Sequence, residues 1–93
     1  MDIDDVYPAA PWIEDKLLDK HGVTMEEVVE AIATARQFRQ AGRDQYGEMR
    51  QGIVGQTQTG RWLTVFFVLR EGNTAAVITA REATKSERTL TRR

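Results

Sequence analysis

The stretch that decides the fold is Trp62-Leu63-Thr64-Val65-Phe66-Phe67-Val68-Leu69, in which every residue is aromatic, aliphatic or β-branched. It lies between Gly60 and the turn-forming residues 71–73, and such a bounded apolar run is typical of a β-strand. Successive side chains of a strand point to opposite faces of its sheet, so this strand has apolar side chains on both faces. We therefore expect it to be the central strand of the sheet.

Weaker strand patterns occur on both sides of this run. Residues 36–40 predict a short edge strand, residues 42–47 a turn, and residues 50–57 a strand that two glycines weaken. Residues 74–81 supply another strand after the central one. Strands that follow one another through short turns usually pair as neighbours, so the sequence predicts an antiparallel meander of three to four strands.

Two short helices are predicted before the sheet. Residues 12–20 place apolar side chains on one helical side and are followed by Gly22, which suits a left-handed C-cap. Thr24 and Glu27 have the spacing of a capping box at the start of a second helix over residues 25–34.

A third short helix is predicted after the sheet. Thr84 and Glu87 repeat the capping-box spacing, and this helix is expected to end near Arg93. The fold class is therefore α+β, with two N-terminal helices, an antiparallel meander and a short C-terminal helix. We expect one domain over residues 1–93, in which residues 1–11 are either flexible or folded over the sheet.

Composition limits what the chain can be. Its 93 residues are 41% hydrophobic, which suffices for one core but not for two. The absence of cysteine excludes disulfides, thiolate metal sites and cysteine nucleophiles. No apolar run approaches membrane-spanning length, and the acidic start of the chain is not followed by the apolar segment of a signal peptide. We expect no membrane partner and a cytoplasmic location.

The net charge of −1 hides an uneven distribution. Residues 1–32 carry nine acidic and two basic side chains, whereas residues 33–93 carry five acidic and eleven basic ones. Ten of those eleven are arginines, whose planar guanidinium binds phosphate in a bidentate manner. The second part of the chain therefore favours a polyanion or an acidic protein as its partner, although ion pairing within the chain better explains any single arginine.

The side chains available for chemistry favour a reaction without a metal or a cofactor. Sequence patterns for dinucleotide-binding loops, P-loops and HExxH metal sites are absent, and the single histidine is His21. RNA cleavage through the 2′-hydroxyl needs a base, an acid and cations around the phosphate, which His, Glu, Lys, Tyr and Arg can supply. His21 near a helix end suits an acid or a phosphate contact, or only a hydrogen bond at that end.

An ordered set of short motifs runs through the chain: KHGV at 20–23, GExR at 47–50, IVG at 53–55, GRWLTV at 60–65 and ITAREA at 78–83. Together they resemble the BrnT family of bacterial type II toxins over most of the chain. The resemblance implies a compact RelE-like ribonuclease fold, an endoribonuclease that cleaves mRNA and arrests growth, and a cognate antitoxin of the BrnA type that also binds operator DNA.

The resemblance also implies six active-site residues, namely Lys20, His21, Glu48, Arg50, Arg61 and Arg81. Arg61 begins the central strand and Arg81 ends the next one, so both are expected near one end of the sheet. They share a face if Leu63 pairs with Arg81, and they lie on opposite faces if Thr64 does. Arg50 is expected at the other end. Glu48 is either the base or one half of a surface ion pair.

Two classes of function remain open: an active RNA-cleaving toxin, or a BrnT-like module that only binds a protein.

The central strand adds a prediction about partners. Its face with Trp62, Phe66 and Val68 is poorly covered by so short a last helix, so we expect the antitoxin or a second copy of the chain to bury part of it. The alternative is that the N-terminal segment covers this face through Tyr7, Pro8, Pro11 and Trp12.

Overall fold

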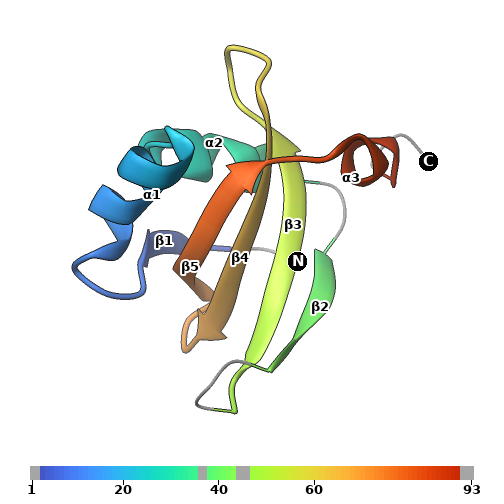
Figure 1. Cartoon of the computed structure of the whole chain (residues 1–93). Coiled ribbons are helices and arrows are strands. Elements are labelled where there is room, and N and C mark those ends of the chain that lie inside the picture. The colour runs from blue at the N-terminus through green and yellow to red at the C-terminus, as the bar shows by residue number, and fades with distance from the viewer. Residues whose placement is uncertain (1–2, 36–37, 44–46, 91–93) are drawn as a thin grey trace.

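The structure is a computed structural model and describes residues 3–35, 38–43 and 47–90. Three helices and five strands follow one another along the chain (Figure 1). In order they are β1 (Asp5–Pro8), α1 (Ile13–His21), α2 (Met25–Thr34), β2 (Phe38–Arg43), β3 (Met49–Gln56), β4 (Trp62–Arg70), β5 (Thr74–Glu82) and α3 (Lys85–Leu90). The predicted α+β class, with two helices before the sheet and a short one after it, is confirmed.

The strands form one sheet in the order β1-β5-β4-β3-β2, with β4 in the middle. Strands β2 to β5 pair as an antiparallel meander, which confirms the predicted connection and the central place of residues 62–69. The edge strand β2 extends beyond residue 40 to Arg43, and residues 36–37 and 44–46 of the expected strand and turn lie outside the described residues.

A fifth strand makes the sheet mixed rather than purely antiparallel. Strand β1 pairs in parallel with β5, from Asp5 opposite Thr74 to Pro8 opposite Val77. The segment 1–11 therefore contributes to the sheet edge, whereas the sequence suggested a flexible segment or a cover. Four residues that include an aspartate and a proline give too weak a strand pattern to be recognised without the neighbouring strand.

The end of α1 and the beginning of α2 lie where the cap residues Gly22 and Thr24 predict. Gly22 has φ 62°, a left-handed conformation that glycine adopts without strain, and it ends α1. The capping box forms at α2: the main-chain N–H of Glu27 donates to Thr24 Oγ1 at 3.2 Å, and that of Thr24 donates to Glu27 Oε1 at 3.1 Å.

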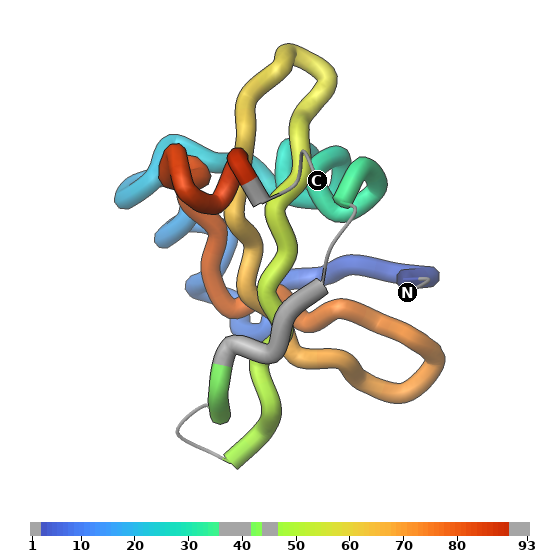
Figure 2. Tube along the Cα trace, turned by 90° about the vertical axis from the view of Figure 1, so that its right-hand side faces the viewer, coloured from blue at the N-terminus to red at the C-terminus, as the bar shows by residue number. Residues whose placement is uncertain are grey.

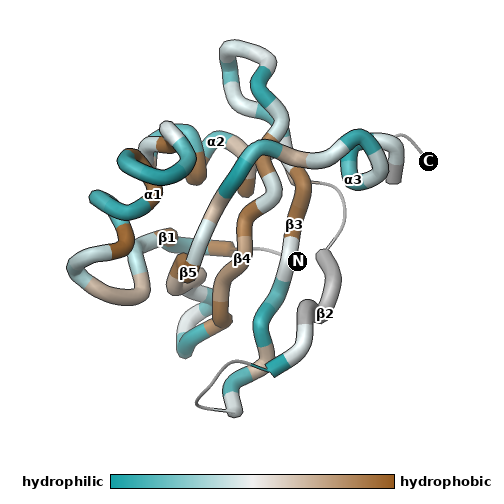
Figure 3. The backbone as a smooth tube through the Cα atoms, viewed as in Figure 1, coloured by the Kyte–Doolittle hydropathy of each residue, from teal (hydrophilic) through white to brown (hydrophobic). Residues whose placement is uncertain are grey.

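The hydrophobic core lies between these two helices and one face of the sheet (Figures 1 and 3). Leu17 of α1 and Val28 of α2 are fully buried in one cluster with Leu63, Val65 and Phe67 of β4. Helix α2 also comes close to β3, since a Cβ at Gly55 would overlap the carbonyl of Ala31. A close backbone approach of this kind explains why glycine stands inside a strand. We call this side of the sheet the covered face.

The other side of the sheet, which we call the open face, presents Trp62, Thr64, Phe66, Val68 and Arg70 on β4. Helix α3 lies over one end of it, near the turn between β3 and β4 (Figures 1 and 2). Trp62 and Phe66 are only half-buried. The N-terminal segment does not cover them, because its strand extends the edge of the sheet instead.

The register of β5 against β4 shifts by one residue halfway along the pair. Phe66 lies opposite Thr79 and Phe67 opposite Val77, so Ile78 is an extra residue in β5. Such a bulge bends its strand locally.

No helix in the described ranges is long and apolar enough to cross a membrane.

Candidate functional site

The six residues expected in the site occupy both faces and both ends of the sheet. Thr64 lies opposite Arg81, which is the register that separates Arg61 from Arg81. Glu82 lies opposite Leu63 on the covered face, and its carboxylate accepts a hydrogen bond from Arg61. Arg81 lies on the open face. The two arginines share one end of the sheet but cannot form one phosphate site, because the sheet lies between them.

Arg61 connects the end of α1 to the beginning of β4. Its Nη2 donates to the carbonyl of His21 at 3.0 Å and its Nη1 to the carbonyl of Gly22 at 2.8 Å. The guanidinium also forms ion pairs of 3.2 Å with Glu27 and with Glu82. We call these five residues the Arg61 cluster. Carbonyls at a helix C-terminus have no intrahelical donor, so Arg61 satisfies two of them and fixes the turn between α1 and α2.

Lys20 and His21 belong to this end of the molecule. Both lie in the last turn of α1, where cations are favoured by the helix dipole. Lys20 is exposed and His21 is half-buried. The structure thus brings Lys20, His21 and Arg61 together, but the contact of Arg61 is with the main chain of His21 and not with its imidazole.

Arg81 is held on the open face by helix α3. Its guanidinium donates to both carboxylate oxygens of Glu87, at 2.8 and 3.0 Å, and to the carbonyl of Glu82 at 3.2 Å. Its Cζ lies 5.7 Å from the centre of the Phe66 ring, within cation–π range.

The carboxylate of Glu87 accepts two further hydrogen bonds. Thr64 Oγ1 donates to it at 2.9 Å, and the main-chain N–H of Thr84 donates at 2.8 Å as half of the predicted capping box. The hydrogen bonds from Arg81 are the main cause that lowers the pKa of Glu87 to about 2, and the same pairing raises the pKa of Arg81. Four donors thus converge on one anion at this end of the open face.

Glu48 and Arg50 lie at the far end of the sheet from the Arg61 cluster. Glu48 forms an ion pair with Arg70, so Glu48 is half of an ion pair, as one of the two expectations had it. The hydrogen bond to Glu48 raises the pKa of Arg70. Arg50 lies opposite Val68, which places it on the open face.

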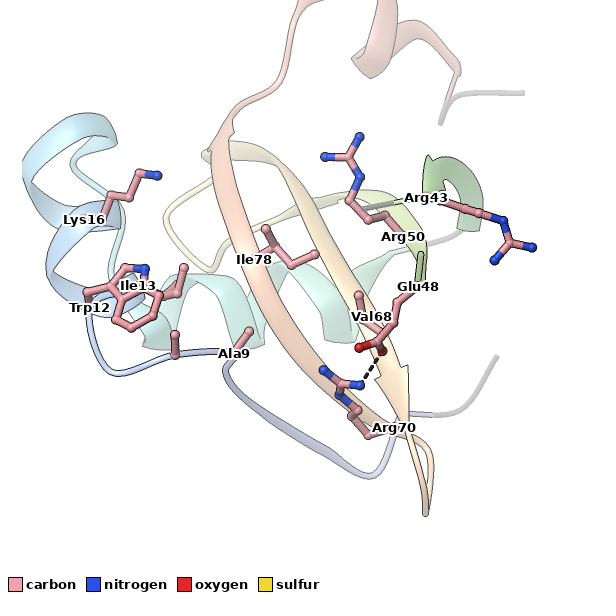
Figure 4. Close-up of a pocket in the computed structure, with 11 residues that line it drawn as sticks. Ala9, Trp12, Ile13, Lys16, Arg43, Glu48, Arg50, Val68, Arg70 and Ile78 are labelled. Carbon is pink, nitrogen blue, oxygen red and sulfur yellow. Dashed lines mark hydrogen bonds and ion pairs between the residues drawn. The ribbon is translucent and has the colours of Figure 1, made fainter. Parts of the chain in front are cut away.

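A groove of about 600 Å³ runs over this part of the open face, between α1 and the strands (Figure 4). Its charged lining residues are Lys16, Arg43, Glu48, Arg50 and Arg70, and its other lining residues are Ala9, Ala10, Trp12, Ile13, Val68 and Ile78. Figure 4 shows Lys16 and Trp12 on α1 facing the strands that carry Arg50 and Arg70, with Ile78 between them. Four cations and one carboxylate give the groove an excess of positive charge.

The sequence did not single out Lys16, Trp12, Arg43 or Arg70 for this site. One signal was available for two of them: Trp12 and Lys16 are four residues apart, the spacing that places side chains on one side of a helix. The other members come from β2, β3 and β4, and only the strand register brings them together.

Among the described residues, no group of three or more histidine, aspartate or glutamate side chains is arranged to hold a metal ion. The open face offers a ligand arginine and lysine cations, the aromatic rings of Trp62 and Phe66, and a threonine hydroxyl beside the carboxylates of Glu48 and Glu87. These groups bind anions and stacked rings, and they stabilise the charge that develops on a phosphate.

Comparison with known proteins gives the family. A search of curated proteins found no match. A sequence model of one protein family, described as "Ribonuclease toxin, BrnT, of type II toxin-antitoxin system", matches residues 12–87, which is most of the chain and includes all six expected site residues. The chain therefore belongs to the BrnT family of ribonuclease toxins of type II toxin–antitoxin systems.

Proposed function

We propose that this protein is a metal-independent endoribonuclease that cleaves mRNA in the cytoplasm and arrests growth, and that RNA reacts on the open face. The family supplies the reaction class, and a type II system implies an antitoxin partner. The set of cations on this face is the observation that supports placing the RNA there. Lys16, Arg50 and Arg70 lie around the groove, and Arg81 lies beyond Phe66. A polyanion is attracted to such a surface even though the whole chain has a net charge of −1.

The proposed reaction begins when a general base removes the proton of the RNA 2′-hydroxyl. The 2′-oxygen attacks the adjacent phosphorus, the bond to the 5′-oxygen breaks, and a general acid protonates that leaving oxygen. A 2′,3′-cyclic phosphate remains on one product. An arginine beside the phosphate stabilises the negative charge of the transition state, which is the role proposed for Arg81.

Arg81 can meet a phosphate only by exchanging its present anion. The carboxylate of Glu87 accepts from Arg81, from Thr64 and from the N–H of Thr84, a donor set that suits a phosphate equally well. We propose that RNA displaces Glu87 and takes over these donors. Because α3 has only six residues, and its Glu87 carboxylate binds Arg81 and Thr64 of the sheet, releasing this carboxylate affects only a short element.

The six expected residues are thereby divided between two roles. Glu48 and His21 lie near opposite ends of the nine-residue strand β4, roughly 25 Å apart at the strand's rise per residue, so they cannot act on one phosphate. We assign Arg81 to the reacting phosphate, Glu48 and Arg50 to contacts with the RNA farther along the open face, and Arg61 to the fold. Lys20 and His21 belong with Arg61, and we propose that they are not required for cleavage.

The antitoxin, of the BrnA type, is proposed to neutralise the toxin by covering the open face. Trp62 and Phe66 are half-buried there, and such apolar side chains beside cations suit a protein interface. Self-association through the same face is proposed for the toxin without its antitoxin. Both kinds of contact would exclude RNA.

The test is RNA cleavage by the purified toxin in excess chelator. We expect cutting to continue and to leave 2′,3′-cyclic phosphate ends, while co-purified antitoxin stops it. Cutting that disappears in chelator and returns with magnesium would contradict the mechanism. A toxin that binds its antitoxin but never cuts RNA nor arrests growth would establish the alternative, a protein-binding module without catalysis.

A further inference from the structure

Trp12 is the most exposed large hydrophobic side chain among the described residues, with 66% of its surface accessible. Trp12 is not part of the hydrophobic core, because Ile13 and Leu17 supply the buried side chains of α1. The indole lies instead at the rim of the groove (Figure 4). An aromatic ring that is exposed beside a charged groove is available to a ligand.

Lys16 extends the same side of α1 by one turn. The main-chain N–H of Lys16 donates to the carbonyl of Trp12 at 3.0 Å, so the two residues are one helical turn apart. Both side chains line the groove. This side of the helix therefore presents a flat ring and, one turn later, an ammonium group. These two groups can bind a base and the adjacent phosphate of one nucleotide.

The opposite wall of the groove also carries positively charged side chains. Arg50 of β3 and Arg70 of β4 stand across from Lys16, and Val68 and Ile78 form an apolar floor between the two walls (Figure 4). A groove of about 600 Å³ falls in the size range of small-molecule sites, so it can hold a segment of nucleotide size. The flanking cations suit the phosphates on either side of such a segment.

We propose that this groove is a binding subsite for single-stranded RNA, in which Trp12 stacks on an unpaired base and Lys16 contacts the adjacent phosphate. The proposal rests on the proposed function and adds a substrate class to it. A base in a duplex is already stacked on its neighbours and is not available to the indole, so the subsite discriminates against double-stranded RNA. The excess of cations over Glu48 favours a nucleic acid as the occupant.

The experiment measures binding without cleavage. The full chain is titrated with a fluorescein-labelled 2′-O-methyl oligonucleotide, which lacks the attacking hydroxyl, once as a single strand and once as a duplex, and anisotropy reports the affinity. Trp12→Ala should weaken single-strand binding by about 5- to 100-fold, as removal of one stacking ring does, while Trp12→Phe retains most of the affinity. Leu18→Ala is the matched control, since Leu18 is 56% exposed on the same helix and does not line the groove.

A second measurement tests contact with the ring itself. The chain has two tryptophans, so Trp62→Phe leaves Trp12 as the only indole, and stacking should quench its fluorescence on titration with the single strand. Lys16→Ala should lower the slope of log affinity against log salt by about one, whereas Lys20→Ala, at a lysine that does not line the groove, should leave it unchanged.

The proposal is overturned if Trp12→Ala binds the single strand as tightly as the wild type, or if the duplex binds equally well. It is also overturned if Trp12→Ala loses only the antitoxin, which would make the groove a protein interface. A toxin that binds RNA through Trp12 but does not cut it supports the subsite and rejects the ribonuclease function. A toxin that cuts RNA and is indifferent to Trp12 rejects the subsite alone.

Discussion

Arginines on the two faces of the sheet are held by different kinds of acceptor. On the covered side, Arg61 donates to the carbonyls of His21 and Gly22, which are fixed by the end of α1. On the open face, Arg81 and Arg70 pair with the carboxylates of Glu87 and Glu48, which are side chains that can rotate away. A phosphate can replace a carboxylate, but it cannot replace the carbonyls of a helix end.

This difference separates a structural arginine from functional ones within a single set of sequence motifs. Arg61 and Arg81 both occupy motif positions, and both form ion pairs with glutamate. Arg61 also donates to two carbonyls at the end of a helix, which shows that its guanidinium belongs to the fold, whereas the one carbonyl that accepts from Arg81 is that of the adjacent residue, Glu82. The comparison predicts that the two faces respond differently to the same substitution.

The largest effect is expected on the open face. Arg81→Ala should lower the rate of RNA cleavage by about 100- to 1000-fold, because one donor to the transition-state charge is lost. The fold should persist, since Glu87 is left near the surface, where water can solvate it. Cleavage rates and circular dichroism of the purified variant check both parts. A folded Arg81→Ala protein with full activity would remove Arg81 from the reaction.

Arg61→Ala should act on stability instead. Losing the hydrogen bonds to two helix-end carbonyls and two ion pairs is expected to lower the free energy of unfolding by about 2 kcal/mol, measured by urea denaturation. Cleavage by the fraction that remains folded should match the wild type. The comparison fails if Arg61→Ala is as stable as the wild type and has lost its cleavage activity.

A smaller effect concerns the pH dependence of α3. Because the pKa of Glu87 falls from 4.5 to about 2 on folding, its ionised carboxylate stabilises the folded state above pH 4.5, and this contribution is lost as the pH falls through about 2. The difference in unfolding free energy between the wild type and Glu87→Gln should therefore be constant above pH 4.5 and shrink below it. Glu82→Gln is the matched control on the covered side. A difference that does not change with pH would show that the ion pair contributes nothing.

Much of the fold could be predicted from local patterns. The eight-residue apolar run marked β4 as the central strand, and Gly22 and the Thr24–Glu27 capping box marked the helix ends. Each of these signals is contained within a few neighbouring residues. Strand β1 was not recognised, because four residues with a proline become a strand only through pairing with β5.

The candidate site could be predicted only as a set of residues and not as an arrangement. A shift of one residue decides whether Arg61 and Arg81 share a face, and both registers satisfied the apolar pattern of β4. The groove lies between α1 and residues of strands β2 to β5, so the four-residue spacing of Trp12 and Lys16 could not reveal it, and Arg43 had no sequence signal of its own for this site. The pairing of strands that are distant in sequence determines this arrangement, and local sequence patterns do not encode it.

The most direct test of the division between the two faces is a titration of the ¹⁵N-labelled toxin with the 2′-O-methyl single strand, followed through the arginine Nε–Hε signals by NMR. The account predicts that the signals of Arg50, Arg70 and Arg81 shift as RNA occupies the open face, while Arg61, which binds the helix end and two carboxylates, stays in place. A shift of Arg61 with no change at Arg50 or Arg81 would place RNA on the other side of the molecule and contradict the account.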